Sequence, residues 1–524
     1  MRQQQLVETM SNPQFYPHRP ETVDFIQTHI SYIFIAGDYV YKVKKPVDFG
    51  FLDFTTLEKR EHYCREELRL NRRLAPQIYL DVVGLAENDQ GDLIWAADGD
   101  RIVEYCVKMK KMPHDNMLKK MLAEGKADPS VMEAVARKVA AFHESAETGG
   151  KIDEIGGIDT IRFNHDENFE QTARYINHTI RARHYDFIKA YIYDFFKKHR
   201  KLLVERVANH RIRDCHGDLH LEHICIAGDD IAIFDCIEFN ERFRYADVAA
   251  EVAFLAMDLD FNGYPNHAEI FVKAYIETTG DTAIQTLLNF YKCYYAYVRG
   301  KVTSFRLDDK GTGPEERREV RKTARKYFDL AYTYAARLEQ PTLILMAGLM
   351  GTGKSALARK LASRLGADII RSDVLRKEML RIDPTERHPD AFGQGIYADD
   401  ISQQTYDKAL EAALAKLRTG RSVIIDASFK KRSERLNAYQ AAKRLPVPFF
   451  VIECRCPDPV IKERLERRAA KKSEASDGRW EIYAAQKNDF DEIIELPNRS
   501  YLTCDTSQSP QVCVHQMIRQ ITNR

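Results

Sequence analysis

The sequence predicts a multidomain protein that combines the α/β and α+β classes, and three observations support this prediction. Its 524 residues suffice for about three folding units of ordinary size, or for two larger ones. Hydrophobic residues make up 44% of the chain and the net charge is +1, a balance that supplies buried cores and excludes disorder as the main state. The pattern along the chain also changes twice, from β-rich to helical and then to alternating strands and helices.

The N-terminal part divides into a β-rich stretch and a longer helical one. Short β-like runs at 32–35, 39–43, 93–96 and 101–109 surround one helical segment near 57–74. From about residue 118 the pattern is mainly helical, with a β-like interruption between Cys215 and Phe239. A charged helix expected at 315–338 ends this helical stretch. We therefore expect a first domain over 1–339, with a small lobe at about 30–112, a helical lobe at about 113–310 and a connecting helix.

Strand-like runs alternate with amphipathic helices from Pro341 onward. The expected strands are 343–347, 369–373, 423–426 and 449–454, and the expected helices are 356–365, 436–445 and 460–467. Such alternation is typical of a parallel sheet with helices on both faces. The sequence therefore predicts a second domain over 340–524 with a doubly wound parallel sheet.

The strongest motif in the chain is GLMGTGKS at 348–355, which fits G-x-x-x-x-G-K-[ST] between a strand and a helix. Glycines there let backbone N–H groups face phosphate oxygens at a helix N-terminus, whereas a purely structural glycine turn is the alternative. Lys354 would neutralise the β- and γ-phosphates and Ser355 would bind Mg²⁺. The expected nucleotide-binding residues of this loop are Gly348, Gly351, Thr352, Gly353, Lys354 and Ser355.

Charged residues follow the neighbouring strands and helices. Asp373 ends the strand at 369–373 and Asp426 ends the strand at 423–426, as a Mg²⁺-binding carboxylate of a P-loop protein would. Arg464, Arg467 and Arg468 precede a polar stretch, 471–478, that is typical of a lid, and Arg464 and Arg468 are expected to bind phosphate groups. Each arginine alone is more consistent with a solvated surface charge, whereas their grouping after successive strands makes the two interpretations equally consistent.

A second group of site residues lies in the first domain. Asp218 belongs to the run HGDLHLEH at 216–223, and Asp235 ends the apolar run that follows a turn at 228–230. Two apolar strands, one on each side of this turn, would bring both carboxylates to one site. There, one carboxylate can accept a hydroxyl proton and the other can hold Mg²⁺.

The small lobe supplies the residues for nucleotide binding. Lys42 and Lys44 share one face of the strand at 39–43, because side chains alternate along a strand. The helix that follows offers Glu66 or Glu67 as an ion-pair partner, and we favour Lys42 with Glu67. The run at 107–113 has the pattern of a strand and hinge that would bind adenine.

These motifs resemble two known kinase families. Residues 341–524 are similar to small P-loop kinases of the gluconate kinase, adenylylsulfate kinase and zeta-toxin type, through 348–355, 372–376, 426–429 and 464–468. Residues 30–310 resemble the aminoglycoside phosphotransferase-like branch of the protein-kinase fold, through 47–54, 70–76 and 234–240. The whole chain resembles bacterial fusions of two such domains. The resemblance implies a bilobal protein-kinase-like fold followed by a P-loop NTPase fold, with Asp218 and Asp373 as catalytic bases.

His223 departs from the pattern of the first family, which usually carries Asn five residues after the catalytic Asp. An imidazole can also bind metal, so we expect His223 and Asp235 to share the N-terminal Mg²⁺, although Mg²⁺ prefers oxygen ligands. A zinc pair with His220 lacks third and fourth ligands at diagnostic spacing.

The sequence thus predicts an ATP- and Mg²⁺-dependent phosphotransferase with two nucleotide sites, acting on a hydroxyl of a small molecule. Two alternatives remain: an active P-loop kinase regulated by an impaired N-terminal domain, and a kinase of nucleic acid or of a nucleotide sugar. The near-neutral charge argues against nucleic acid as a partner. Ten scattered cysteines, with neither a signal peptide nor a membrane span, indicate the cytoplasm.

Overall fold

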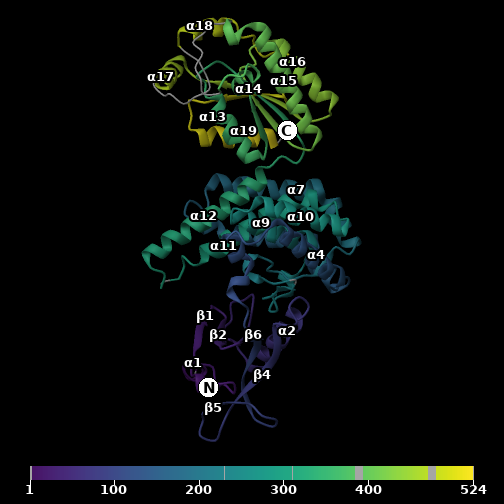
Figure 1. Cartoon of the computed structure of the whole chain (residues 1–524), viewed down its shortest axis with the longest axis vertical. Coiled ribbons are helices and arrows are strands. Elements are labelled where there is room, and N and C mark those ends of the chain that lie inside the picture. Colours follow the sequence, from purple (N-terminus) through teal and green to yellow (C-terminus); the bar gives the residue numbers. More distant parts are fainter. Residues whose placement is uncertain (1–2, 229, 310, 384–393, 470–479, 523–524) are drawn as a thin grey trace. The chain divides into compact units, whose positions relative to one another are not determined.

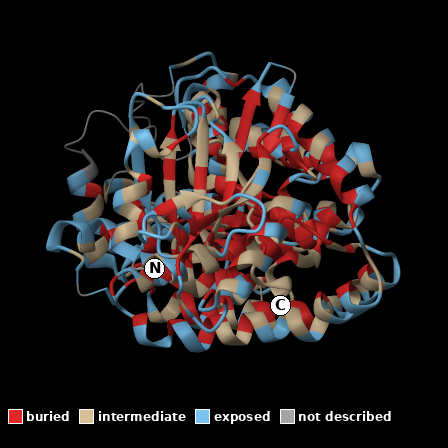
Figure 2. Cartoon of the chain, turned by 90° about the horizontal axis from the view of Figure 1, so that it is seen from below, coloured by how far each residue is buried: buried red, intermediate tan, exposed pale blue. Residues whose placement is uncertain are grey.

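A computed structural model describes residues 3–228, 230–309, 311–383, 394–469 and 480–522, without the side chains of 468 and 469 (Figure 1). The chain divides into two compact units, Met1–Ala335 and Ala336–Arg524. Buried residues lie along the inner faces of strands and helices, and exposed residues lie at the periphery (Figure 2). Among the described residues, no helix is long and apolar enough to cross a membrane.

The first unit begins with a six-stranded antiparallel sheet in the order β1-β2-β3-β6-β4-β5. Its strands are β1 (Val23–Gln27), β2 (Ser31–Ala36), β3 (Tyr39–Lys44), β4 (Tyr79–Glu87), β5 (Leu93–Trp95) and β6 (Ile102–Lys110). Helices α1 (Gln3–Met10) and α2 (Leu57–Asn71) accompany it. The sheet therefore starts before residue 30, and β1 and β4 are additions to the strands expected from sequence.

Each of these two helices belongs to a separate apolar cluster of the small lobe. Leu6 and Met10 of α1 pack with Phe34 and Tyr41, whereas Cys64 of α2 packs with Val107. The start of α2 is fixed by Thr56, whose side chain accepts a hydrogen bond from the backbone N–H of Lys59, as a good N-cap does. Helix α2 packs against β6 and β4.

The rest of the first unit is mainly helical. Its helices are α3 (Leu118–Ala123), α4 (Pro129–Ser145), α5 (Lys151–Ile155), α6 (Ile158–Thr172), α7 (Ala182–Ala208), α8 (Glu241–Arg244), α9 (Val248–Phe261), α10 (Pro265–Thr279), α11 (Ile284–Phe305) and α12 (Pro314–Ala336). Helix α9 is buried over most of its length. A helix that is apolar on every side belongs in the centre of a lobe.

The charged helix expected as a connection is an integral part of this lobe. In α12, the ring of Tyr332 stacks on His184 at 4.1 Å and the ring of Tyr327 stacks on Phe261 at 3.7 Å. Its amphipathic pattern thus reflects one face packed on the helical lobe and one face in solvent.

Two small antiparallel ribbons hold the loop regions of the first unit. One pairs β7 (Ile212–Asp214) with β10 (Tyr245–Asp247), and the other pairs β8 (Ile224–Ala227) with β9 (Asp230–Ile233). The β-like interruption expected between Cys215 and Phe239 corresponds to the second ribbon. It brings the segment after β9 back to the loop at 216–223.

The second unit is built on a five-stranded parallel sheet in the order β12-β13-β11-β14-β15. Its strands are β11 (Leu343–Ala347), β12 (Asp368–Arg371), β13 (Val423–Asp426), β14 (Phe449–Arg455) and β15 (Tyr501–Asp505). Its helices are α13 (Lys354–Leu365), α14 (Ser372–Met379), α15 (Asp399–Arg418), α16 (Arg432–Arg444), α17 (Asp458–Ala469), α18 (Trp480–Asn488) and α19 (Pro510–Thr522).

The core of this sheet explains why its strands read as continuous apolar runs. Side chains of β11, β13 and β14 pack with α15 and α16 in one cluster, and α13 and α19 contact the sheet and each other. Parallel strands covered by helices on both faces need apolar residues at every position.

Candidate active sites

The loops after the parallel strands of the second unit converge at one edge of the sheet. Strand β11 leads into the glycine-rich loop, β12 into Ser372 and Asp373, and β13 ends at Asp426. The carboxyl ends of strands in such sheets form the ligand crevice, especially where the strand order reverses. The structure thus brings together the residues that the sequence places after separate strands.

The glycine-rich loop passes close to the neighbouring strand. Gly348 has a φ of +125°, and a Cβ at this position would lie 2.6 Å from the carbonyl oxygen of Cys454. No other residue fits such an approach. The loop ends at Gly353, which precedes the first turn of α13, and the ammonium group of Lys354 donates a hydrogen bond to the carbonyl oxygen of Leu349 at 2.8 Å.

The expected metal-binding residues of this unit lie in contact. The Ser355 hydroxyl is hydrogen-bonded to the carboxylate of Asp426, and Nε of Arg371 lies 3.6 Å from Oδ2 of the same carboxylate. Burial raises the pKa of Asp426, and the nearby charge of Asp373 raises it further. A hydroxyl and a buried carboxylate side by side are oxygen donors that fit Mg²⁺.

Asp373 lies in the first turn of α14, because the strand expected over 369–373 ends at Arg371. Its Oδ1 is 3.2 Å from Nη1 of Arg376, a buried residue of the same helix. The Nε atoms of Arg371 and Arg376 have no hydrogen-bond partner within the described ranges. The buried guanidinium group of Arg376, with one donor that makes no hydrogen bond among the described residues, suits an anionic group.

The expected lid arginines are placed only in part. Arg464 donates a hydrogen bond from Nη2 to the carbonyl oxygen of Thr506 at 2.7 Å, and its Nη1 lies 3.4 Å from a Cβ built on Gly353. This guanidinium therefore lies against the phosphate loop. Arg467 is exposed on α17. The side chain of Arg468 and the stretch 471–478 lie outside the described residues.

Three of the four basic residues at 430–435 form ion pairs with acidic residues of the same unit. Lys430 and Lys431 both form ion pairs with Asp489. Arg435 is fully buried and donates from Nε to Glu495 at 2.6 Å. Charges that are paired in this way offer little to a phosphate backbone, which weakens the nucleic-acid alternative.

In the first unit, the expected lysine–glutamate pair is extended into a network. The ammonium group of Lys42 lies 2.8 Å from Oε1 of Glu67 and 2.8 Å from Oδ1 of Asp235. Lys44 contacts Oε2 of Glu67 at 2.7 Å and forms a second ion pair with Glu238. Burial favours neutral Lys42, but the charges of Asp235 and Glu67 outweigh it and hold the pKa of Lys42 well above its ordinary value.

The loop at 216–223 places three further polar side chains at the same site. His223 donates from Nδ1 to the backbone carbonyl of Asp218 at 2.9 Å, and its Nε2 lies 3.4 Å from Oδ2 of Asp235. Nε2 of His220 lies 3.4 Å from Oδ2 of Asp218. Burial opposes ionisation of Asp218, yet the charge of His220 holds the pKa of that carboxyl well below its usual range. Burial lowers the pKa of His223.

Asp235 itself adopts a φ of +63°. Few residues other than glycine occupy this left-handed region, and such strain is concentrated at functional sites. The backbone N–H of Asp235 donates to the hydroxyl of Tyr79. This turn directs one carboxylate oxygen to Lys42 and the other to His223.

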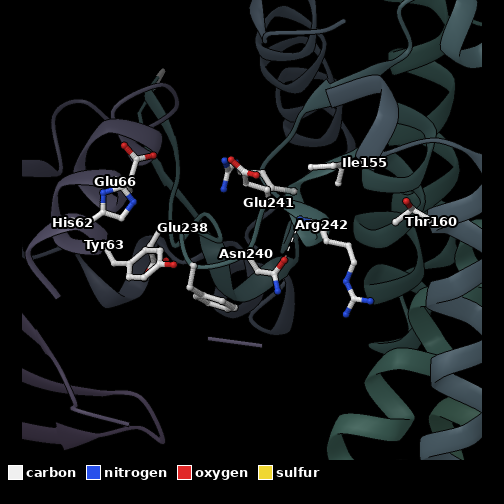
Figure 3. Close-up of a pocket in the computed structure, with 11 residues that line it drawn as sticks. His62, Tyr63, Glu66, Ile155, Thr160, Glu238, Asn240, Glu241 and Arg242 are labelled. Atoms are coloured by element: carbon white, nitrogen blue, oxygen red, sulfur yellow. Dashed lines mark hydrogen bonds between the residues drawn. The ribbon is translucent and has the colours of Figure 1, made fainter. Parts of the chain in front are cut away.

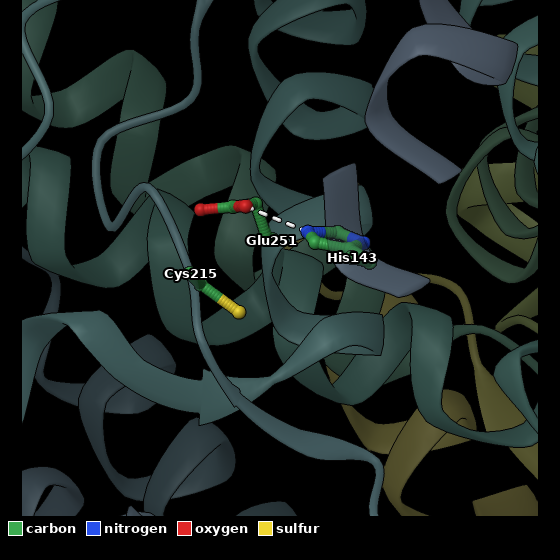
Figure 4. Close-up of side chains that lie close together, drawn as sticks. All are labelled: His143, Cys215 and Glu251. Carbon is green, nitrogen blue, oxygen red and sulfur yellow. Dashed lines mark hydrogen bonds and ion pairs between the residues drawn. The ribbon is translucent and has the colours of Figure 1, made fainter. Parts of the chain in front are cut away.

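Two buried carboxylates of α9 accept hydrogen bonds from the backbone of the loop at 216–223. Oε1 of Glu251 accepts hydrogen bonds from the backbone N–H groups of His216 at 2.8 Å and Gly217 at 2.7 Å, and Asp258 accepts one from Leu221. Oε2 of Glu251 accepts a hydrogen bond from Nε2 of His143 at 2.7 Å (Figure 4). These residues were not expected from the sequence, although two carboxylates seven positions apart in an apolar helix are a visible signal.

Cys215 lies beside Glu251 and His143, so the three could be taken for a metal site (Figure 4). Every candidate nitrogen and oxygen is already used: Nδ1 of His143 contacts the Tyr275 hydroxyl at 2.7 Å, and both oxygens of Glu251 accept hydrogen bonds. Burial also raises the pKa of Cys215 well above its ordinary value, which disfavours the thiolate that binds metal. The cluster therefore positions the loop.

A cavity of about 540 Å³ lies beside the segment that follows Asp235. Figure 3 shows His62, Tyr63 and Glu66 of α2 on one side, Ile155 and Thr160 on the other, and Asn240, Glu241 and Arg242 between them. Glu238, the partner of Lys44, also lines it. Polar groups of both charges next to aromatic rings suit a small polar molecule.

Two family models match the chain, one within each unit. A family described as the phosphotransferase enzyme family matches residues 51–285, and one described as an AAA domain matches residues 343–493. The uncharacterized protein Rv2004c of Mycobacterium tuberculosis is 30% identical over 471 residues, which cover 90% of this chain and 91% of that protein. The chain belongs to the same family. A counterpart in Mycobacterium bovis has the same identity and coverage.

This family joins a protein-kinase-like phosphotransferase domain to a P-loop kinase domain, so the expected fold class is confirmed. A gluconokinase from Sinorhizobium meliloti has 17% identity, covers 35% of this chain and 93% of its own, and gives a TM-score of 0.26. A choline/ethanolamine kinase family protein from Mesorhizobium loti has 12% identity. It covers 63% of this chain and 99% of its own, and gives a TM-score of 0.38. The family assignment identifies the chain as a phosphotransferase.

Proposed function

We propose that this protein uses ATP and Mg²⁺ at two separate sites, one in each unit, and transfers the γ-phosphoryl group to a hydroxyl of a small molecule. The observation that carries the proposal is the group of Lys354, Ser355, Asp373 and Asp426 at the carboxyl edge of one parallel sheet. A phosphate loop, a metal-binding pair and a further carboxylate are the parts that phosphoryl transfer to a hydroxyl requires.

In the second unit, the backbone N–H groups of the glycine-rich loop and Lys354 would bind the β- and γ-phosphates. Bound Mg²⁺, held by Ser355 and Asp426, would supply charge neutralisation. Asp373 would accept the proton of the acceptor hydroxyl, and Arg371, Arg376 and Arg464 would bind the phosphoryl oxygens or an anionic group of the acceptor.

In the first unit, Lys42 would bind the phosphates of ATP while Glu67 keeps its ammonium group in place. Asp218 would accept the acceptor's proton, because its carboxylate is ionised at neutral pH, although its lowered pKa makes it a weaker base than an ordinary Asp. Asp235 and His223 face each other across 3.4 Å and fit a divalent cation. The loop that carries Asp218 is held by Glu251 and Asp258.

One observation favours a second candidate function, in which the first unit binds nucleotide but regulates the second. His223 stands where the resembling family carries Asn, and the hydrogen bond from its Nδ1 to the carbonyl of Asp218 fixes it there. A nitrogen ligand for Mg²⁺ would slow N-terminal turnover.

Replacement of the P-loop lysine tests the proposal for the second unit. In an Asp218→Asn background, Lys354→Ala should lower ATP-dependent phosphotransfer by about 10²- to 10³-fold, as the loss of one charge-stabilising donor does. Lys360→Ala, which removes an exposed lysine of the same helix, is the matched control and should leave turnover unchanged. Release of ADP during a metabolite screen gives the rate, and thermal melting checks the fold. Full turnover in the Lys354→Ala variant would disprove the assignment.

A further inference from the structure

The hydrogen bonds of His223 fix which of its ring nitrogens can bind a metal. Nδ1 contacts the backbone carbonyl of Asp218 at 2.9 Å, and a carbonyl oxygen can only accept, so Nδ1 carries the hydrogen. In the neutral ring, Nε2 then carries a lone pair. This lone pair lies 3.4 Å from Oδ2 of Asp235, another acceptor.

Two acceptors that face each other at this distance need a shared positive charge, which is either a proton on Nε2 or a metal ion bound to both atoms. The other oxygen of Asp235 is already occupied by the ammonium group of Lys42 at 2.8 Å, which leaves Oδ2 for that charge. Two ligand atoms that each lie about 2.1 Å from one ion, at a tetrahedral angle, are about 3.4 Å apart. The separation between Nε2 and Oδ2 is therefore the separation that a shared cation requires.

We propose that the N-terminal site binds its divalent cation through Nε2 of His223 and the carboxylate of Asp235, and that it therefore selects a transition-metal ion over Mg²⁺. Imidazole nitrogen suits ions such as Zn²⁺, Co²⁺ and Fe²⁺, whereas Mg²⁺ prefers an all-oxygen site. The inference rests on the proposed nucleotide site of the first unit and replaces Mg²⁺ at that site by a transition-metal ion.

The neighbouring His220 has the opposite arrangement, which makes it a matched control. Its Nδ1 accepts a hydrogen bond from the backbone N–H of Glu222 at 3.2 Å, so the hydrogen of the neutral ring is on Nε2, facing Asp218. That hydrogen bond orients the Asp218 carboxylate. His220 thus offers no lone pair to a metal.

Pulsed electron paramagnetic resonance of Mn²⁺ with ATP provides the test, because it detects ligand nuclei without any turnover. The measurement uses the full-length Lys354→Ala variant, in which the P-loop site is weakened. We expect ³¹P coupling from ATP together with ¹⁴N coupling from an imidazole. His223→Asn should remove the ¹⁴N coupling and shift the Mn²⁺-to-Mg²⁺ affinity ratio toward Mg²⁺ by about tenfold. His220→Asn should retain the coupling.

The outcomes separate this inference from the proposed function. If ³¹P coupling is present without ¹⁴N coupling, the nucleotide site stands and the proposed ligand is wrong. If His220→Asn removes the coupling and His223→Asn does not, the inference is also overturned. If neither coupling is detected and ATP fails to bind, the nucleotide site of the first unit is itself disproved. The spectrum of the parent variant decides the question even if His223→Asn does not fold.

Discussion

Asp373 is the residue on which the proposed chemistry of the second unit depends most directly. Replacement by Asn keeps its shape but removes the base, so Asp373→Asn should slow phosphoryl transfer by about 10²- to 10⁴-fold and leave ATP affinity nearly unchanged. The alternative, that Asp373 caps α14, would leave turnover intact, and α14 has no side-chain cap. Single-turnover rates and ATP titrations would be compared between the wild type and Asp373→Asn.

A suitable control lies at the opposite end of the preceding strand. Asp368 begins β12 and forms ion pairs with Lys416 and Arg421. Asp368→Asn removes a carboxylate from the same strand–helix unit, far along the strand from the phosphate loop. It should lower stability slightly and leave the phosphoryl-transfer rate unchanged.

We expect His165 to make the first unit sensitive to acid. Its ring is buried among Phe196, Phe290 and Tyr294, and burial lowers its pKa to about 3. Below the ordinary value of about 6.5 the unfolded chain binds a proton that the folded chain excludes, so stability falls as the pH falls from 6.5 toward 3. The loss approaches about 1.4 kcal/mol per pH unit.

His165→Phe should remove this contribution, because the replacement ring does not titrate. We expect the urea midpoint of the wild type to fall more between pH 7 and pH 4.5 than that of the variant. His178→Phe, which removes a histidine outside the core, should behave like the wild type. Equal acid sensitivity of wild type and His165→Phe would contradict the assignment.

At the scale of elements, helix α9 is a core helix that also supports the loop at 216–223. Burial favours the neutral acid, but the hydrogen bond from His143 keeps the pKa of Glu251 below its usual range. In Glu251→Gln, the amide N–H₂ group would face either Nε2 of His143 or the backbone N–H groups of the loop. Both of these are donors, so hydrogen bonds would be lost. We expect kcat of the N-terminal site to fall by about 10- to 100-fold, with a smaller change in KM for ATP.

Asp260 provides the control on the same helix. It forms an ion pair with Lys292 at 3.0 Å and accepts a hydrogen bond from Tyr334, away from the loop. Asp260→Asn should lower the melting temperature without a selective loss of kcat. A loss of kcat that merely parallels the loss of stability in both variants would argue against a positioning role for Glu251.

The elements also show what the sequence could predict. The strands of the second unit are continuous apolar runs, so β11 and β13 could be located, and the phosphate loop followed from its motif. Strand β1 is an edge strand with mostly exposed side chains and shows no alternation. The supports at Glu251 and Asp258 depend on a fold that brings α9 under the loop at 216–221, and no local pattern contains that information.

At the scale of the whole molecule, each unit contains its own set of the residues that we propose to bind nucleotide. Lys42, Glu67 and Asp235 belong to the first unit, and Lys354, Ser355 and Asp426 belong to the second. No described residue of either set is supplied by the other unit. Loss of one site should therefore leave the other able to bind nucleotide.

Binding stoichiometry is the measurement that follows from this separation. Equilibrium dialysis of the full-length protein with a non-hydrolysable ATP analogue should give two molecules bound per chain in the presence of Mn²⁺. Lys354→Ala and Lys42→Ala should each reduce this to one, because each removes the cation that binds phosphate at one site. The double variant should bind none, and Lys360→Ala should bind two. A stoichiometry of one in the wild type, abolished by Lys354→Ala alone, would make the P-loop unit the only nucleotide-binding part and the first unit a scaffold.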